Sequence, residues 1–359
     1  MKYRSSILLL FIVLTTSANL SAQDGGAPLS FLPSDSISFI DGDVSNWHLF
    51  PLSEYGELTA KSVEVKKRSH KKDAKRWKKQ VRKHPVNLVG GSGDESLPHQ
   101  GKYAAEMTHI AARMFLHTGQ SSYIDLMERA LCNALPACVL QEKNDDKKTA
   151  RLAAQTILDA AGTVYALRGD TVFLNFYQNC YAHIPMKDFD FTIDQVTGMP
   201  FAGRFKIRLG RVPHGGRDFV ICLRLPEWLS ERPEIYVNGH DWEYDTLRGY
   251  AVISRKWLNR DEVYFNFPEL PFVQKSDDGA NSFLRNRALI YAFPAIESIP
   301  EANPVLTRIV SEYDDGITPH PHYKVIFRVG NKDYEAIASP YLDVSADKRH
   351  VKISVSPDM

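Results

Sequence analysis

The spacing of apolar residues changes once along this chain, and the change limits the folds that it can adopt. Between Tyr103 and about Ala166, apolar residues recur every three or four positions, which places them on one side of a helix. After Gly169-Asp170 they alternate with polar residues, as in strands that bury one face. The sequence therefore predicts an α+β chain in which a short helical part precedes an all-β part.

Three helices are expected in the first part. Gly119 should end the first, and Pro136 should end the second. Ser122 and Asp125 are spaced for a capping arrangement at the start of the second helix. The third is expected over residues 148–166. The apolar stripe of the first helix consists of Tyr103, Met107, Ile110, Ala111, Met114 and Phe115.

Short alternating segments follow at fairly even spacing. The turn signals Gly215-Gly216, Asn238-Gly239 and Asp278-Gly279 separate some of them. This pattern predicts an antiparallel β-sandwich in which each strand buries one face. The expected strands include residues 172–176, 189–193, 205–209, 219–225, 250–252, 263–267, 289–293, 323–329 and 351–355.

The first 23 residues have the features of a cleavable export signal. Lys2 and Arg4 precede an apolar run at residues 7–14, and small residues follow within residues 17–22. The run is far shorter than the roughly 20 residues that a helix needs to cross a bilayer. We therefore expect a soluble mature protein, secreted or periplasmic, with no membrane span. Losing Lys2 and Arg4 with the leader changes the net charge from +1 to −1.

Basic residues dominate the segment from Lys66 to Lys83, in which Asp73 is the only acid. Such a run is typical either of an arm that binds an anionic surface or nucleic acid, or of a solvated helix or linker. Only Trp77 lies between the charges, whereas a surface that stacks bases uses several aromatic side chains. We therefore expect a solvated segment and no nucleic-acid partner.

Few residues are spaced as a catalytic or metal-binding motif requires. The chain has no Gly-rich phosphate loop, no Gly-x-Ser-x-Gly elbow and no His-Glu-x-x-His pair. His320 and His322 flank a proline and would be weak metal ligands, and the acidic pairs at 145–146, 277–278 and 314–315 should be solvated turn residues. We expect the cysteines to be small buried apolar residues or to form one incidental disulfide. They are Cys132, Cys138, Cys180 and Cys222.

Six segments occur in an order and spacing that indicate a family. Residues 223–228 read Leu-Arg-Leu-Pro-Glu-Trp, and residues 235–239 read Ile-Tyr-Val-Asn-Gly. Residues 123–133, 170–177 and 249–268 occur in the same order around them, and Ala-Ser-Pro-Tyr follows at 338–341. Together these segments resemble the β-L-arabinofuranosidase family, glycoside hydrolase family 127, over roughly residues 90–345.

The resemblance implies an (α/α)₆ barrel that carries the active site, followed by β-sandwich domains. It also implies a zinc-bound cysteine nucleophile, a glutamate acid/base and the removal of terminal arabinofuranose from plant-type glycans. Zinc keeps a thiol deprotonated at neutral pH, and a carboxylic acid protonates the leaving oxygen.

The sequence departs from this pattern at the catalytic positions. Residues 140–149, where the family has a long insert ending in paired cysteines, contain no cysteine. The Glu-x-Cys zinc pair of the family corresponds to Glu106-Met-Thr108, so the carboxylate is kept and the thiolate is replaced by Thr108. The acid/base glutamate corresponds to Glu95 after Gly90-Gly91. We therefore expect no bound zinc, with Glu95 and Glu106 as the remaining candidates.

Length also argues against a complete barrel. Twelve helices with connecting loops need about 190 residues, whereas residues 24–166 supply 143. The expected organisation is a leader at 1–23, a lead-in and basic linker at 24–85, a remnant of the helical barrel at 86–168 and a β-sandwich region at 169–359.

The resulting expectation is a secreted glycoside hydrolase-like protein, related to β-L-arabinofuranosidases and catalytically impaired or inactive. One alternative is a carbohydrate-binding or accessory module, because Trp228, Trp242, Tyr244, Tyr250 and Trp257 offer aromatic faces for sugars, although most of them alternate into the predicted core, where packing explains them. The other is a structural protein that docks with itself or with a separate catalytic chain. An exposed stripe at Met107, Ile110 and Met114 would favour that second alternative.

Overall fold

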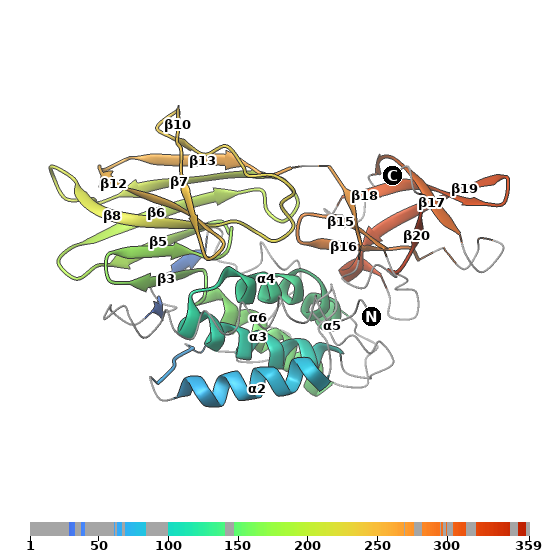
Figure 1. Ribbon diagram of the computed structural model, residues 1–359, viewed down its shortest axis with the longest axis horizontal. Coiled ribbons are helices and arrows are strands. Elements are labelled where there is room, and N and C mark those ends of the chain that lie inside the picture. The colour runs from blue at the N-terminus through green and yellow to red at the C-terminus, as the bar shows by residue number, and fades with distance from the viewer. Residues whose placement is uncertain are drawn as a thin grey trace, which may run out of the picture.

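In the computed structural model the main helices end at Ala161 and most strands follow them, which confirms the predicted α+β order (Figure 1). The structure describes residues 29–32, 37–39, 61, 63–66, 69–83, 100–140, 147–268, 270–275, 282–294, 296, 299, 304–313, 321–344 and 351–356. The leader at 1–23, Glu95, the three acidic pairs, Asp278-Gly279 and His320 lie outside these residues.

The helical part forms one layer beneath the strands in Figure 1. As predicted, the first apolar stripe is helical, and Gly119 ends that helix with a positive φ of 69°. In the described ranges no helix is both long enough and apolar enough to span a membrane. The helices are α2 (His70–Lys83), α3 (Gln100–Thr118), α4 (Ser121–Arg129), the π-helical segment η6 (Ala130–Ala134), α5 (Leu135–Leu140) and α6 (Lys147–Ala161).

Two predicted features of the second helix are wrong. Gln120, whose side chain makes no capping hydrogen bond, is the N-cap of α4, and the Asp125 carboxylate instead binds an arginine on a strand. Pro136 does not end the helix. It is the second residue of α5, which continues directly from the π-helical segment η6, so the helical path runs on through the proline.

The third helix is shorter than predicted. It ends at Ala161, because Gly162 and Thr163 turn the chain with hydrogen bonds to Asp159 and Ala160 three residues back. The apolar residues that follow, which the helical spacing included, form the buried strand β3 (Tyr165–Arg168) instead.

The strands form three sheets, with the predicted antiparallel pairing everywhere except between β4 and β8 and between β17 and β20, which are parallel. Two short strands of the lead-in, β1 (Ser30–Phe31) and β2 (Ile37–Phe39), join the edges of the first and second sheets. The first sheet has the order β1-β3-β4-β8-β12-β11 and contains β4 (Thr171–Leu174), β8 (Arg217–Arg224), β12 (Tyr250–Trp257) and β11 (Asp245–Leu247).

The second sheet has the order β10-β9-β13-β7-β6-β5-β2. Its strands are β10 (His240–Asp241), β9 (Tyr236–Val237), β13 (Glu262–Asn266), β7 (Arg204–Gly210), β6 (Asp190–Thr197) and β5 (Cys180–Pro185). Asn238 and Gly239 have positive φ values of 53° and 83°, as the predicted tight turn between β9 and β10 requires.

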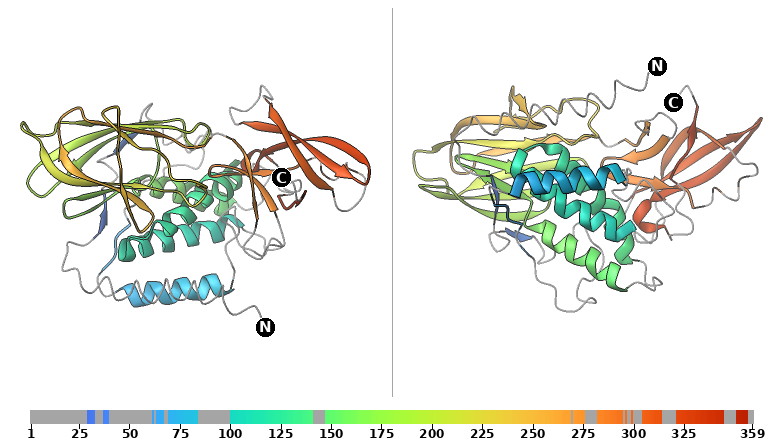
Figure 2. Two further views of the ribbon diagram at one scale, coloured as in Figure 1. Left: turned by 45° about the horizontal axis from the view of Figure 1, so that its top comes forward. Right: turned by 60° about the horizontal axis from the view of Figure 1, so that its bottom comes forward.

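The third sheet lies at the other end of the molecule, in orange and red (Figures 1 and 2). It has the order β14-β15-β16-β19-β18-β17-β20. The short 3₁₀ helix η8 (Tyr341–Asp343) comes directly after β19 in the chain. Its strands are β14 (Phe272–Lys275), β15 (Ser282–Asn286), β16 (Leu289–Ala292), β17 (Val305–Tyr313), β18 (His322–Val329), β19 (Lys332–Pro340) and β20 (Ser354–Val355).

The first two sheets face each other across a shared core. Phe191 on β6 and Phe219 on β8 have ring centroids 4.6 Å apart, and the Tyr165 hydroxyl donates to Gln195 Oε1 across the same interior. Helix α3 joins this core, because the Phe115 ring meets the Phe173 ring of β4 at 6.4 Å. Helices and both sheets therefore share one hydrophobic interior.

The turn between β11 and β12 rests on the corner between α3 and α4. The Ser121 N–H donates to Arg248 O at 3.0 Å, and Arg248 Nη1 donates to Thr118 O at 2.9 Å. Gly249 has a φ of 82°, and a Cβ there would collide with Ser121 Oγ. The corner therefore needs glycine for its backbone angle and for its lack of a side chain.

Candidate functional site

Of the two predicted site residues, Glu95 and Glu106, the structure describes Glu106. This residue lies on α3, on the side that α2 covers. Arg76 Nη2 and Gln80 Nε2, both on α2, donate to Glu106 Oε1 at 2.7 and 2.9 Å. Burial opposes ionisation of Glu106, but the bonds from Arg76 and Gln80 and the Arg76 charge outweigh it and lower the pKa. Glu106 is therefore held as an ionised partner of a guanidinium.

The residues around Glu106 do not fit the zinc ion that the resemblance implies. Thr108, in the position of the thiolate, is buried, and its hydroxyl donates to Ala104 O at 2.8 Å within the same helix. Arg76 already occupies the carboxylate and would repel a cation. Among the described residues, no three His, Cys, Asp or Glu side chains are grouped as metal ligands.

The four cysteines are free thiols, and Cys138, Cys180 and Cys222 are buried, as expected for small apolar residues. Burial raises the pKa of Cys180 and of Cys222 to about 12, and it holds the pKa of Cys132 well above the usual range. A thiol becomes a nucleophile by losing its proton. Cys132, Cys180 and Cys222 therefore keep their protons at neutral pH and are not activated.

The predicted tryptophan and tyrosine candidates divide into packed and half-buried residues. Trp228, Tyr250 and Trp257 are buried in the core, which confirms packing for these three. Trp242 and Tyr244 are half-buried, and the guanidinium groups of Arg255 and Arg232 lie 5.3 and 4.5 Å from their respective rings.

A further aromatic pair was not predicted. Tyr236 on β9 and Tyr264 on β13 face each other across the strands, with ring centroids 4.8 Å apart and planes 7° from parallel. Both are half-exposed. Alternation with the buried neighbours Val237 and Val263 is the signal that would have placed both tyrosines on the outer face.

The stripe at Met107, Ile110 and Met114 is not exposed, whereas a docking face would need these side chains at the surface. These side chains are 0%, 2% and 2% exposed because they belong to the core shared with the sheets.

His322, predicted as a weak metal ligand, is buried, and its Nδ1 lies 2.9 Å from Ser339 Oγ on the neighbouring strand β19. We therefore assign His322 to packing of the third sheet.

Arg224, at the end of β8, carries a buried charge. Its side chain is fully buried, and Nη1 lies 2.6 Å from Asp125 Oδ1, while Nη2 bonds Glu128 Oε1. Asn175 O accepts from Arg224 Nε at 2.6 Å. The Trp228 indole donates to Glu128 Oε2 at 2.9 Å. The arginine, both carboxylates and the indole are thus joined in one buried network.

This network was not predicted, although the spacing of its two carboxylates along the chain is a signal for it. Asp125 and Glu128 are three residues apart and so share one side of α4, which faces the sheet. Arg224 lies in the Leu-Arg-Leu-Pro-Glu-Trp segment that carries the resemblance. Burial raises the pKa of Asp125 to about 7, against the lowering effect of the Arg224 charge.

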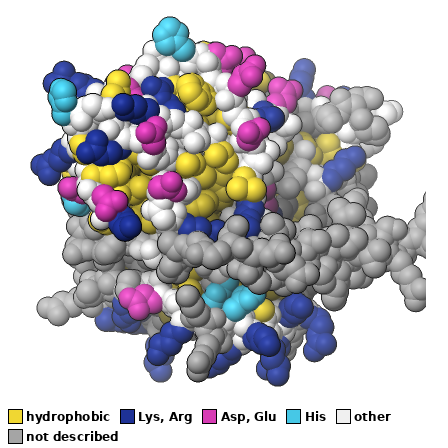
Figure 3. Space-filling view, turned by 60° about the vertical axis from the view of Figure 1, so that its left-hand side comes forward, with side chains coloured by type: hydrophobic (Ala, Val, Ile, Leu, Met, Phe, Trp, Pro, Cys, Tyr) yellow, Lys and Arg dark blue, Asp and Glu magenta, His cyan; other side chains and the backbone are white. Residues whose placement is uncertain are grey.

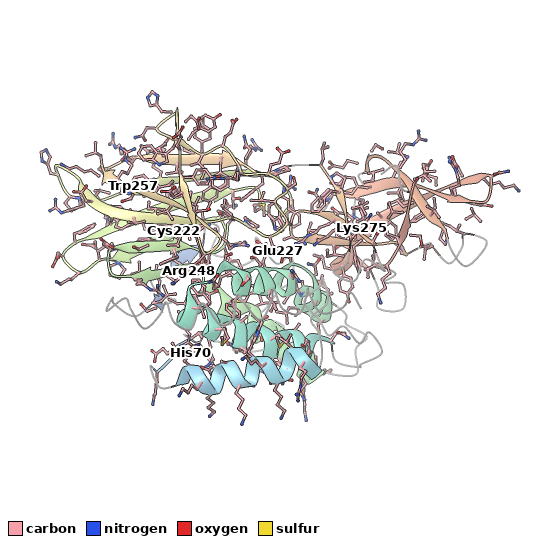
Figure 4. The ribbon with its side chains drawn as sticks, viewed as in Figure 1. His70, Cys222, Glu227, Arg248, Trp257 and Lys275 are labelled. Carbon is pink, nitrogen blue, oxygen red and sulfur yellow. The ribbon has the colours of Figure 1, made fainter. Side chains whose placement is uncertain are left out.

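A second ion pair extends this network toward the third sheet. Glu227, labelled above α4 in Figure 4, accepts hydrogen bonds from Arg129 on α4. Arg285 Nη1 on β15 lies 3.4 Å from Glu227 Oε1 and donates to Gln274 Oε1 at 2.6 Å. These contacts link the helices, the first sheet and the third sheet, and the burial of the network indicates a structural role.

Asn133 makes a second link between the helices and the third sheet. Its Nδ2 donates to Ala288 O at 2.9 Å, and its Oδ1 accepts from the Ile290 N–H at 2.9 Å. Asn133 is completely buried, so these bonds satisfy backbone groups that water cannot reach.

Comparison with known proteins assigns part of the chain to a family. Residues 171–269 match the model described as β-L-arabinofuranosidase, GH127 middle domain. This range covers the first two sheets from β4 to β13 and includes Arg224 and Trp228. No curated protein sequence matches the chain.

Three solved structures with a similar fold are described as GH127 enzymes or as a glycoside hydrolase. A GH127 β-arabinofuranosidase matches with a TM-score of 0.64 and 20% identity over 77% of this chain and 54% of that chain. A GH127 β-L-arabinofuranosidase from Geobacillus stearothermophilus T6 matches with a TM-score of 0.65 and 19% identity over 77% and 55%. A glycoside hydrolase matches at 0.62 and 16% over 77% and 60%. The chain therefore spans little more than half the length of these structures.

Proposed function

The chain is a relative of the GH127 β-L-arabinofuranosidases, and from this premise we propose that it is an exported, glycan-directed protein without the zinc–thiolate activity of that family. The relationship rests on residues 171–269, where the middle-domain model matches. The substrate class that we propose is the arabinofuranose-containing glycan of plant type, and the leader at residues 1–23 supports export.

We also propose how the fold corresponds to the family. Helices α3, α4 and α6 would represent the end of an (α/α)₆ barrel, and the first two sheets would represent a β-sandwich. Two observations support this assignment: the sheets pack face to face through Phe191 and Phe219, and α3 packs on their shared core through Phe115.

The observation that carries the proposed loss of activity is the environment of Glu106. Its carboxylate is bonded to Arg76 and Gln80, and Thr108 replaces the second zinc ligand. Zinc sites need several ligand atoms directed at one point, with a deprotonated thiolate when cysteine is used. A carboxylate occupied by a guanidinium beside a threonine does not provide this.

The test is an assay of the full mature chain with 4-nitrophenyl β-L-arabinofuranoside, with and without added zinc. We expect no nitrophenol release above the uncatalysed rate in either condition. Release that is abolished by Glu95→Gln or Glu106→Gln would establish a working glycosidase and contradict the proposal. A matched control is Glu335→Gln, which changes an exposed carboxylate on the third sheet.

A carbohydrate-binding module is the second candidate, favoured by the half-exposed Tyr236 and Tyr264 rings on one face of the second sheet. Aromatic faces on a rigid strand surface are suited to stacking against sugar rings. Arabinan binding by the mature chain that Tyr264→Ala weakens would support this role. Tyr181→Ala is the control, because Tyr181 is 40% exposed on β5 of the same sheet.

The structural-partner alternative loses the observation that would have favoured it, since Met107 and Met114 are buried within this chain. We therefore retain the glycan-directed function as the conclusion.

A further inference from the structure

Helix α2 presents a strongly basic surface to solvent. It contains eight lysine and arginine residues, and its only acid is Asp73. In Figure 4 its side chains extend away from the rest of the protein, and in Figure 3 dark-blue side chains gather at the same lower edge. We call the exposed residues of this helix the basic face. They are Lys71, Lys72, Lys75, Arg76, Lys78, Lys79 and Arg82.

The opposite side of α2 is fixed against α3, so the basic face has a defined orientation. Asp73 is buried, and Arg113 binds it through two hydrogen bonds of 3.1 and 2.9 Å. His117 Nε2 lies 3.0 Å from the same carboxylate. The Trp77 ring meets the Tyr123 ring edge-on, with centroids 5.0 Å apart. The single acid and the tryptophan of α2 are therefore both used for attachment.

This distribution of charge is unfavourable in the free protein. Lys71, Lys75 and Lys79 are four residues apart, so each lies one helical turn from the next, and like charges at this spacing repel. Without its leader the chain has a net charge of −1, so the concentration of positive charge on one helix is local. A negatively charged polymer along the helix would relieve the repulsion over its length of about 21 Å.

We propose that the basic face binds an acidic polysaccharide, a chain of sugars that carry carboxylate groups. Electrostatic attraction along α2 supplies the binding, and this part stands on the basic face alone. The choice of a polysaccharide over other polyanions rests on the proposed glycan-directed function.

Two other polyanions fit the surface less well. Single-stranded nucleic acids are bound by aromatic platforms combined with basic grooves, and Trp77 of α2 is instead occupied by Tyr123. A helix that inserts into a membrane surface presents apolar side chains to the lipid. The apolar residues of α2, Ala74, Trp77 and Val81, pack against the protein core.

The test measures binding of polygalacturonate to the mature full chain by isothermal titration calorimetry at 50 and 200 mM NaCl. We expect binding that weakens at the higher salt concentration, because the contacts are between exposed charges. The triple variant Lys71→Gln, Lys75→Gln, Lys79→Gln should reduce the affinity about tenfold. A control with the same change of charge is Lys187→Gln, Lys256→Gln, Lys332→Gln, whose residues are exposed on other parts of the surface and should leave binding unchanged.

Each result separates the possibilities. Absence of polygalacturonate binding, or equal affinity of the triple variant and the wild type, overturns the proposal. Equal or tighter binding of double-stranded DNA or of phosphatidylglycerol vesicles through the same lysines overturns the assignment to a polysaccharide. Circular dichroism of the triple variant shows whether α2 is still folded. Release of nitrophenol from the arabinofuranoside would contradict the proposed function without affecting binding at α2.

Discussion

Arg224 Nη1 on strand β8 lies 2.6 Å from Asp125 Oδ1 on helix α4, with 0% and 5% of the two side chains exposed. Glu128 binds the same guanidinium from the next turn of the helix. A buried ion pair gives little net stability by itself, but removal of one partner leaves an uncompensated buried charge. This relationship makes the junction between helix and sheet sensitive to single substitutions.

Substitution of Arg224 by alanine should destabilise the protein by about 3–5 kcal/mol, because Asp125 and Glu128 lose their buried partner. Urea unfolding followed by tryptophan fluorescence measures the change. Arg328→Ala is the control, since Arg328 pairs with Asp333 at the exposed surface of the third sheet, where water screens the pair and its loss should change stability little. Similar losses for both variants would contradict a special role of Arg224.

The stability of the protein should depend on the protonation of Asp125. Burial raises its pKa from 3.8 to about 7 in the folded protein, so the folded state binds a proton more tightly than the unfolded state does. The resulting stabilisation is fully present below pH 3.8 and is lost as the pH rises to about 7. Asp125→Asn should therefore flatten the dependence of the unfolding free energy on pH between 5 and 7.

The measurement for Asp125 is a series of urea titrations at pH 5, 6 and 7 on the wild type and the variant. Asp218→Asn serves as the comparison, because that carboxylate is exposed on β8. The assignment fails when Asp125→Asn and the wild type lose stability equally over this range.

Replacing Asn133 by alanine should cost about 2–4 kcal/mol, because Ala288 O and the Ile290 N–H lose buried hydrogen-bond partners. The loss should appear first as earlier unfolding of the third sheet, since Asn133 connects that sheet to the helices. Hydrogen exchange of the β16 amides, compared with those of β8, measures it. Asn266→Ala changes an exposed amide on β13 and should leave both sets unchanged.

All four cysteines should react slowly with Ellman's reagent in the native protein at pH 8 and completely after unfolding. The physical reason is burial, which raises the pKa values of Cys180 and Cys222 to about 12 and leaves almost no thiolate. The rate of reaction in the native protein and the number of thiols that react in guanidinium chloride test the two parts of the prediction. Fewer than four would show a disulfide, and a fast thiol in the native protein would show an activated cysteine.

The alternation of apolar residues predicted most central strands because each buries one face against a common core. The stretch Phe219/Ile221/Leu223 is an example, since all three residues are buried on β8. Helical spacing, by contrast, gave a wrong prediction at Val164 and Ala166. Both continue the apolar spacing of α6, but they follow the turn that ends this helix and lead into the first sheet. A helical spacing cannot identify the residue at which tertiary contacts replace it.

Long-range polar contacts were beyond prediction from spacing alone. Arg224 and Asp125 are 99 residues apart, and nothing local indicates that the arginine turns inward at the end of a strand. The basic helix was foreseen as a solvated segment, and the structure confirms a helix with an exposed basic side. The bond from Arg76 of this helix to Glu106 could not be inferred from composition, because it depends on how two helices pack.

The close approach of Gly249 to Ser121 has a consequence for how such proteins can diverge. A turn without room for a methyl group ties the β11–β12 hairpin to the α3–α4 corner, so a change of shape in one requires a compensating change in the other. Recombination with a breakpoint between the helices and the strands would separate these two surfaces from their partners. The helical segment and the first two sheets are therefore expected to be inherited as a single block.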